Sequence, residues 1–201
     1  MAGTGTTAAR MSARERRRQL LDVTRAIVAE RGFHEVSIEA VAREAGITRP
    51  VVYGHFTDLP GLLEALVDQE SERALGQLAA VLPRDLAAGD PRRLLLGALR
   101  GYLDAVHAEP VTWRLVLMPP EGAPAVLRDR IAQGRAAVVE QLAAAMSPGL
   151  GAGRRSPDPE LTARTLSALA DEAARLLLTD PETYSPARLL RHAAWLLEEL
   201  S

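Results

Sequence analysis

The side chains that could carry out chemistry in this sequence form no recognisable catalytic or metal-binding pattern. No spacing among the four histidines suits a metal site, and no cysteine is present to complete one; the histidines are His34, His55, His107 and His192. Lysine is also absent, which excludes the Gly-Lys-Ser or Gly-Lys-Thr of a phosphate-binding loop. Asp171 and Glu172 are adjacent acids, and adjacent residues lie on different sides of a helix. We therefore expect no catalytic residues, no metal, no cofactor and no enzymatic activity.

A different chemistry is offered by Arg49, Tyr53 and His55, which follow one another within a short segment. If this segment is helical, Val52 and Phe56 are four residues apart and can face the interior together. Arg49, Tyr53 and His55 then point outward. Their polar and aromatic groups are of the kind that a recognition helix presents to the major groove of DNA.

Two short helices joined by a tight turn would position these groups. Four apolar side chains recur with the spacing of one buried helix face, Ile38, Val41, Ala42 and Ala45. Ser37 is a suitable N-cap, and Gly46 suits the left-handed conformation that ends many helices. Thr48 can cap a second helix that has Pro50 in its first turn. The pattern predicts a helix-turn-helix, although such helix pairs also occur in ordinary α-helical bundles.

The segment from about Arg14 to Leu66 resembles the DNA-binding domain of the tetracycline-repressor (TetR) family of bacterial transcription regulators. The resemblance rests on AERGFHEVSIEAVAREAGI, on VYGHF at the end of the second motif helix, and on DLPGLLEAL after it. It implies that the chain binds double-stranded DNA. The residues that it assigns to DNA contact are Thr48, Arg49, Tyr53 and His55, with Ser37 as a phosphate ligand at a helix N-terminus.

Two positions depart from the family pattern. Leu59 stands where members commonly have a lysine that touches phosphate, and Gly54 replaces a side chain between the tyrosine and the histidine. We therefore expect DNA contact to depend on Arg49, Tyr53, His55 and the arginine-rich first helix.

The charge distribution fits a nucleic-acid partner better than the net charge of −2 does. Residues 10–56 contain nine arginines and six acids, a balance of +3, and the rest of the chain carries −5. The positive charge thus lies on the segment with the predicted helix-turn-helix, as phosphate binding requires, although a solvated basic face is the alternative. No apolar run approaches the roughly 20 residues of a membrane span, so we expect a cytoplasmic protein with no membrane partner, and the family resemblance implies a bacterial one.

The predicted fold is all-α, with a three-helix helix-turn-helix domain followed by a C-terminal helical domain for ligand binding and dimerisation. We expect a disordered tail in residues 1–10, a DNA-binding domain in 11–57 and the C-terminal domain in 58–201. Hydrophobic periodicity, prolines and glycines predict about nine helices, in residues 12–31, 37–45, 48–56, 57–82, 91–109, 111–118, 124–146, 159–178 and 185–200. The Gly-, Pro- and Ser-rich segment 147–158 is expected to be a loop.

The last two helices, 159–178 and 185–200, are apolar over more than one core-facing stripe. Helices of this kind are usually buried on two sides. The pattern and the family resemblance therefore predict a homodimer through these helices, and a single large internal core is the alternative.

The family resemblance also implies a ligand pocket in the C-terminal domain. Its candidate lining residues are large apolar or amphipathic side chains together with two polar anchors: Leu99, Tyr102, Leu103, Trp113, Leu117, Met118 and Leu142, with His107 and Asp171. Ordinary core packing is the alternative for each of them. Such a lining suits a mostly apolar small molecule.

Together these expectations describe a homodimeric regulator, a repressor that a small ligand releases from a palindromic operator. The alternative is a small helical ligand carrier or enzyme that uses the C-terminal cavity, with the N-terminal helices as a structural cap.

Overall fold

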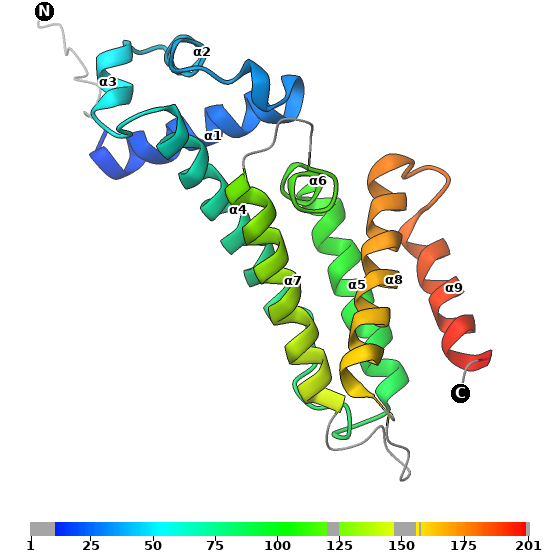
Figure 1. The fold of residues 1–201 in the computed structure, drawn as a ribbon. Helices are drawn as coiled ribbons and strands as arrows, with labels where there is room; N and C mark the ends of the chain where they lie inside the picture. Colours follow the sequence, from blue (N-terminus) through cyan, green and yellow to red (C-terminus); the bar gives the residue numbers. More distant parts are fainter. Residues whose placement is uncertain (1–10, 120–124, 147–155, 157, 200–201) are drawn as a thin grey trace, which may run out of the picture. The chain divides into compact units, whose positions relative to one another are not determined.

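The computed structural model describes residues 11–119, 125–146, 156 and 158–199. Within these residues the chain forms nine α-helices and one short 3-10 helix, and it has no β-strand there (Figure 1). The prediction of an all-α fold is therefore confirmed. The chain divides into two compact units, Met1–Leu66 and Val67–Ser201.

The N-terminal unit begins with α1 (Ala13–Arg31), whose first turn is closed by a capping box. The Ser12 hydroxyl accepts a hydrogen bond from the Glu15 amide at 3.2 Å, and the Glu15 carboxylate accepts one from the Ser12 amide at 2.8 Å. These bonds from Ser12 hold the pKa of the Glu15 carboxyl below its ordinary value. Gly32, with a φ of 87°, ends the helix in a conformation that favours glycine.

Three short elements follow α1 and complete the unit: η1 (Phe33–Glu35), α2 (Ile38–Glu44) and α3 (Arg49–Tyr53). Figure 1 shows α2 and α3 after the blue α1, at the N-terminal end of the chain. The buried apolar residues of the whole unit include Leu20, Ile27, Phe33, Val41, Val52 and Phe56. Phe33 is thus part of the small core of this unit.

The boundary between the two units lies within α4. The C-terminal unit contains most of α4 and five further helices. Their bounds are α4 Leu59–Val81, α5 Pro91–Ala108, α6 Pro110–Leu117, α7 Ala125–Met146, α8 Pro159–Thr179 and α9 Pro186–Glu199. Asp90 and Asp158 cap α5 and α8 by accepting hydrogen bonds from backbone amides. Each of these helices lies where the hydrophobic periodicity predicts one, and the eight residues of α6 form a helix and not a strand.

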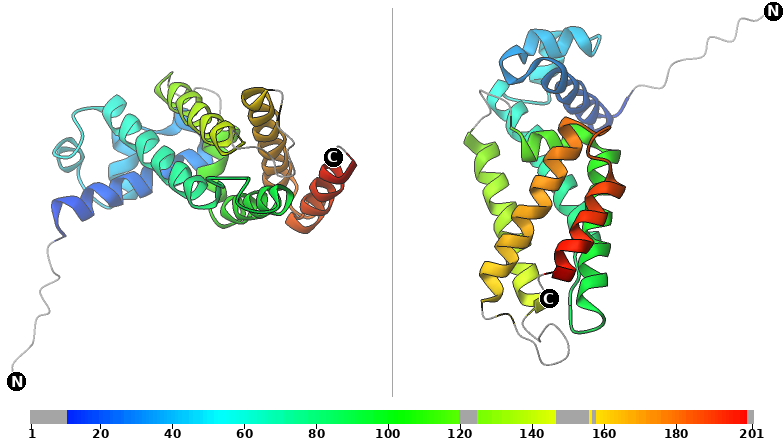
Figure 2. Two further views of the ribbon diagram at one scale, coloured as in Figure 1. Left: turned by 90° about the horizontal axis from the view of Figure 1, so that it is seen from below. Right: turned by 90° about the vertical axis from the view of Figure 1, so that its right-hand side faces the viewer.

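Helix α8 lies at the centre of the packing in the C-terminal unit, because it contacts α5, α6 and α7. Helix α9 packs on α5, and the left view of Figure 2 shows it at the outer side of the unit. The predicted tail, residues 1–10, and nearly all of the predicted loop 147–158 lie outside the described residues.

Two apolar clusters lie in the interior of the described part of the C-terminal unit. The first is centred on Tyr102 and Trp113, whose rings meet edge to face at a centroid distance of 4.9 Å. The second joins the segment after α4 to α7 and α8, and includes the completely buried Leu86 and Ala145. The Leu86 amide donates to the Ala145 carbonyl at 3.0 Å, which fixes that segment against the end of α7.

Candidate nucleic-acid interface and ligand cavity

Helices α2 and α3 pack on each other and are joined by a tight turn at Gly46, which has a φ of 67°. The Ile47 amide donates to the Ala42 carbonyl at 2.9 Å and closes the end of α2. Val52 and Phe56 are buried, as expected for the inner face of α3. This is the geometry of a helix-turn-helix.

The outer face of α3 presents most of the side chains that the sequence predicts for DNA contact. Thr48 and Arg49 are exposed, the Tyr53 side chain is 46% exposed, and His55 is half-buried. The Arg49 guanidinium lies 2.7 Å from the Glu39 carboxylate of α2. A hydrogen bond with Tyr53, followed by the charge of Glu39, raises the pKa of Arg49 above its ordinary value. Arg49 is therefore held as a cation between two neighbouring side chains.

The two predicted N-caps of the motif differ in their hydrogen bonding. The Ser37 hydroxyl accepts a hydrogen bond from the Ala40 amide at 3.1 Å, so it caps α2 while one hydroxyl proton remains to donate. Thr48 occupies the N-cap position of α3, but its side chain makes no capping hydrogen bond. The Thr48 hydroxyl is thus not engaged in holding the helix start.

Arg17 has a role that its place in the arginine-rich start of α1 does not reveal. Its guanidinium donates to the His55 carbonyl at 3.0 Å and lies 4.3 Å from the centroid of the Phe56 ring. These contacts connect α1 to the residues that follow α3. Sequence spacing gives no signal for them, because 38 residues separate the two partners of the hydrogen bond.

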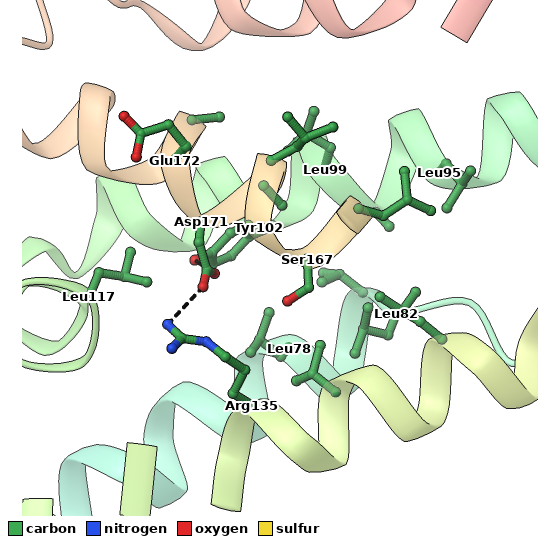
Figure 3. A pocket seen from close by; sticks show the side chains of 18 of the residues that line it. Leu78, Leu82, Leu95, Leu99, Tyr102, Leu117, Arg135, Ser167, Asp171 and Glu172 are labelled. Carbon is green, nitrogen blue, oxygen red and sulfur yellow. Dashed lines mark hydrogen bonds and ion pairs between the residues drawn. The ribbon is translucent and has the colours of Figure 1, made fainter. Parts of the chain in front are cut away.

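The C-terminal unit contains a cavity of about 850 Å³. Residues from α4 to α9 line it, and most of these are leucine, valine, isoleucine or alanine (Figure 3). Six of the nine predicted pocket residues are among them: Leu99, Tyr102, Trp113, Leu117, Leu142 and Asp171.

Three of the predicted pocket residues do not line the cavity. Leu103 is completely buried in the cluster of Tyr102 and Trp113 and is not among the residues that line the cavity. His107 is exposed on the last turn of α5, and Met118 is exposed just after α6. Their placement corrects the prediction, since helical spacing alone does not tell which side of a helix faces a cavity.

A polar cluster lies at one end of the cavity and centres on Asp171, whose side chain is 16% exposed. Its carboxylate accepts a hydrogen bond from the Tyr102 hydroxyl at 3.2 Å and one from Arg135 of α7 at 2.9 Å (Figure 3). Arg175 lies 4.0 Å from the same carboxylate. Burial, followed by the Asp171 charge, raises the pKa of Tyr102 far above its ordinary value, so this hydroxyl remains a donor. No pattern in the sequence marks Arg135, because only the packing of α7 on α8 brings it to Asp171.

A second buried polar group links α4 and α6. The Glu70 side chain is 2% exposed, and its carboxylate accepts a hydrogen bond from the buried Thr112 hydroxyl at 2.5 Å. Arg73 lies 3.6 Å from Glu70 and 3.2 Å from Glu109. Among the described residues, no group of three or more histidine or acidic side chains could hold a metal ion. No helix in the described part of the chain is long and apolar enough to cross a membrane.

The fold and the helix-turn-helix define the class of the protein as an all-α helix-turn-helix regulator. Residues 20–66 match the family of bacterial regulatory proteins described as the tetR family. This match and the similarity of the fold to TetR-like structures support a TetR-family transcriptional regulator.

A curated relative and two solved structures show the extent of the similarity. The chain is 37% identical over 89 residues to the HTH-type transcriptional regulator BetI of Yersinia pestis (strain Pestoides F), and the match covers 44% of each protein. It thus spans less than half the length of the curated relatives that it matches.

The structural similarity extends over nearly the whole chain. A TetR-like transcriptional regulator from Rhodococcus sp. RHA1 is 25% identical, with a TM-score of 0.71, and the match covers 94% of this chain and 99% of that one. The transcriptional regulator FadR from Bacillus subtilis, solved in complex with stearoyl-CoA, shares the fold at 15% identity, with a TM-score of 0.68 over 90% and 96% of the two chains.

Proposed function

We propose that the protein is a homodimeric repressor that binds a palindromic DNA operator and is released from it by a small, mostly apolar ligand. In this proposal residues 11–57 bind the operator, and residues 58–201 bind the ligand and form the dimer. Operator binding requires access to the chromosome, so the proposed site of action is the bacterial cytoplasm.

The observation that carries the DNA-binding role is the outer face of α3. Arg49 and Tyr53 stand exposed on the second helix of a helix-turn-helix, within the segment that matches the TetR family. A helix that presents a guanidinium and aromatic hydrogen-bonding groups can read base edges in the major groove, with arginine suited to guanine. Ser37, Thr48 and His55 flank this surface and are proposed to complete it.

The dimer proposal is supported by apolar side chains that a single protomer leaves uncovered. Leu161 and Leu169 on α8 are 58% and 54% exposed, and Trp195 on α9 is 51% exposed. The two leucines are eight residues apart and therefore share one side of the helix. A second copy that pairs α8 and α9 with their equivalents would bury these groups and place two helix-turn-helix motifs on one duplex.

The ligand proposal is supported by the cavity of about 850 Å³, a volume within the range of small-molecule sites. A regulator with the same fold, FadR, has been solved with stearoyl-CoA bound. In the proposed mechanism, the ligand binds the arrangement that cannot bind DNA more tightly than the arrangement that can. The shift in population is limited by the ratio of these two affinities.

Selection of bound sequences from random DNA tests the operator proposal. We expect a palindrome to be enriched, and affinity for it to fall with salt at a log–log slope of about −0.9 per neutralised phosphate. If no sequence is enriched and the salt slope is near zero, the operator proposal is wrong and the alternative, a ligand carrier, is favoured.

Two variants test the surface itself. Tyr53→Ala and His55→Ala should weaken binding to the selected palindrome while the molecular mass in solution stays the same. His34→Ala is the matched control, because His34 is an exposed histidine of the same unit outside α2 and α3. Unchanged binding by both test variants would refute the assigned surface.

A further inference from the structure

The charged side chains that line the cavity are balanced by opposite charges. Among the described lining residues, Arg135 pairs with Asp171 at 2.9 Å, and Glu172 pairs with Arg175 at 3.1 Å. Arg130 lies 2.8 Å from the Asp68 carboxylate, in an ion pair without hydrogen-bond geometry. The wall of the cavity therefore holds no unmatched charge among these groups.

This balance disfavours a ligand with a charged head. An anionic group that approaches Arg135 also meets the Asp171 carboxylate, and two like charges at such distances repel each other. A cationic group that approaches Asp171 meets Arg135 and Arg175 in the same way. An uncharged hydroxyl can accept from Arg135 and donate to Asp171, and it loses far less hydration on entry than an ion does.

The polar cluster and the leucines Leu82 and Leu95 lie at different positions along the cavity. Tyr102, Arg135 and Asp171 meet at one end, whereas Leu82 and Leu95 lie toward the other, as Figure 3 shows. Seven residues separate Tyr102 from Leu95 on α5, which is ~10 Å along a helix. The same separation on α7 leads from Arg135 to Leu142, which also lines the cavity. The lining thus extends along the helices and is mostly apolar, with the ion-paired cluster toward one end and Ser167 between the cluster and Leu82.

We propose that the ligand is an uncharged, elongated amphiphile whose single hydroxyl or similar hydrogen-bonding group lies against Tyr102, Arg135 and Asp171 and whose apolar chain lies along the leucines. This inference rests on the proposed role of the cavity as the effector site. The Arg135–Asp171 ion pair then acts as a selectivity filter that rejects both acids and amines of the same shape.

Three probes of equal chain length test the head-group preference: n-octanol, octanoate and octylammonium. Isothermal titration of the full chain at neutral pH should show n-octanol binding at least about tenfold tighter than either charged probe, because like-charge juxtaposition costs affinity. Equal or tighter binding of a charged probe, or binding of none of the three, would overturn the proposal.

Two charge-removing variants provide a sharper test. Asp171→Asn leaves Arg135 without its carboxylate, so octanoate should gain affinity relative to n-octanol. Arg135→Gln leaves the Asp171 charge without its α7 partner, so octylammonium should gain instead. Glu160→Gln is the control, because Glu160 pairs with Arg164 on the same helix, both are more than half exposed, and neither lines this cavity. If octanoate gains no affinity in Asp171→Asn and octylammonium gains none in Arg135→Gln, the proposed selectivity filter is wrong.

A parallel measurement of DNA binding separates this inference from the operator proposal. If the chain binds n-octanol with the expected preference but binds no DNA, the operator proposal is wrong and the ligand class stands. If it binds the selected palindrome but favours a charged probe, the ligand class is wrong and the operator proposal stands.

Discussion

Arg17 combines a surface position with contacts that belong to the interior of the DNA-binding unit. Its guanidinium covers one face of Phe56 and also donates to the His55 carbonyl. The planar cation can satisfy both partners at once, whereas a lysine ammonium would not stack in this way. Arg17 therefore supports the position of the residues that follow α3.

Replacement of Arg17 by alanine should lower the free energy of unfolding by about 1 kcal/mol, because an exposed cation–π contact and one hydrogen bond are lost. Urea unfolding followed by circular dichroism gives this value. Arg18→Ala is the control, since Arg18 is the next exposed arginine of the same helix turn. Equal stability of the two variants would contradict the role given to Arg17.

Tyr102 makes the stability of the C-terminal unit depend on pH in the alkaline range. Burial raises its pKa in the folded chain, whereas an unfolded tyrosine has a pKa of about 10. The neutral hydroxyl therefore contributes stability that is fully present below pH 10 and is lost as pH rises toward the folded value.

Unfolding free energies measured in urea between about pH 9 and 11 should fall more steeply for the wild type than for Tyr102→Phe, which has no hydroxyl to ionise. The variant should start from a lower stability at neutral pH, because Asp171 loses a donor. Parallel pH profiles would show that Tyr102 ionises as easily in the folded chain as in the unfolded one.

At the scale of the helices, α4 and α5 approach each other closely at Gly101. A Cβ atom at this position would lie 2.5 Å from Cγ1 of Val81, which is too close for any real contact. Glycine is required here by the neighbouring helix and not by its own backbone conformation. At Gly97, one turn earlier on α5, a Cβ would meet nothing within 4 Å.

Gly101→Ala should therefore lower the free energy of unfolding by about 1 to 3 kcal/mol, the usual cost of overpacking. Gly97→Ala should raise it by about 0.5 to 1 kcal/mol, because alanine is the better helix former where space is open. Thermal and urea unfolding of the pair measure the difference. Two shifts of the same sign would mean that α4 and α5 separate to admit a methyl group.

The helices could be predicted because their signals are local. Ser12, Ser37 and Asp90 cap helices through amides two or three residues away, and Gly32 and Gly46 end helices through their own φ angles. The periodicity of α8 and α9 likewise indicates apolar surface on more than one side.

The cavity wall could be predicted only in part, because it depends on how helices distant in the sequence pack. Several large apolar residues predicted on α5 and α6 line the cavity, yet Leu103 is buried in the core and His107 faces solvent. Arg135 has no local feature that distinguishes it from other arginines on helix surfaces. Its function becomes visible only through its distance to Asp171.

At the scale of the whole molecule, the uncovered leucines of α8 connect ligand binding and assembly. Leu161 and Leu169 are exposed on α8 and also border the cavity. A partner that covers them would therefore close one side of the cavity as well. The proposed dimer and the proposed ligand site share the same helix.

A charge on this surface should separate the protomers. Leu169→Glu should convert the dimer to a monomer in sedimentation experiments and weaken binding to a full palindrome by at least about a hundredfold, because two linked half-site contacts become one. Met118→Glu is the matched control, because Met118 is an exposed apolar residue outside α8 and α9. A Leu169→Glu dimer with full operator affinity would contradict the proposed interface.

The ion pair between Glu39 and Arg49 bears on how the protein would find its operator in a genome. Any DNA sequence must replace the Glu39 carboxylate as the partner of Arg49, and a guanine edge with two acceptors can compensate better than other bases. Glu39→Gln should therefore raise affinity for scrambled DNA more than affinity for the selected palindrome. The dissociation constant for scrambled DNA divided by that for the palindrome should fall. An unchanged or larger ratio would contradict this reading. The carboxylate would thus lower the time spent on the millions of competing sites, which matters more for occupancy of one operator than affinity alone.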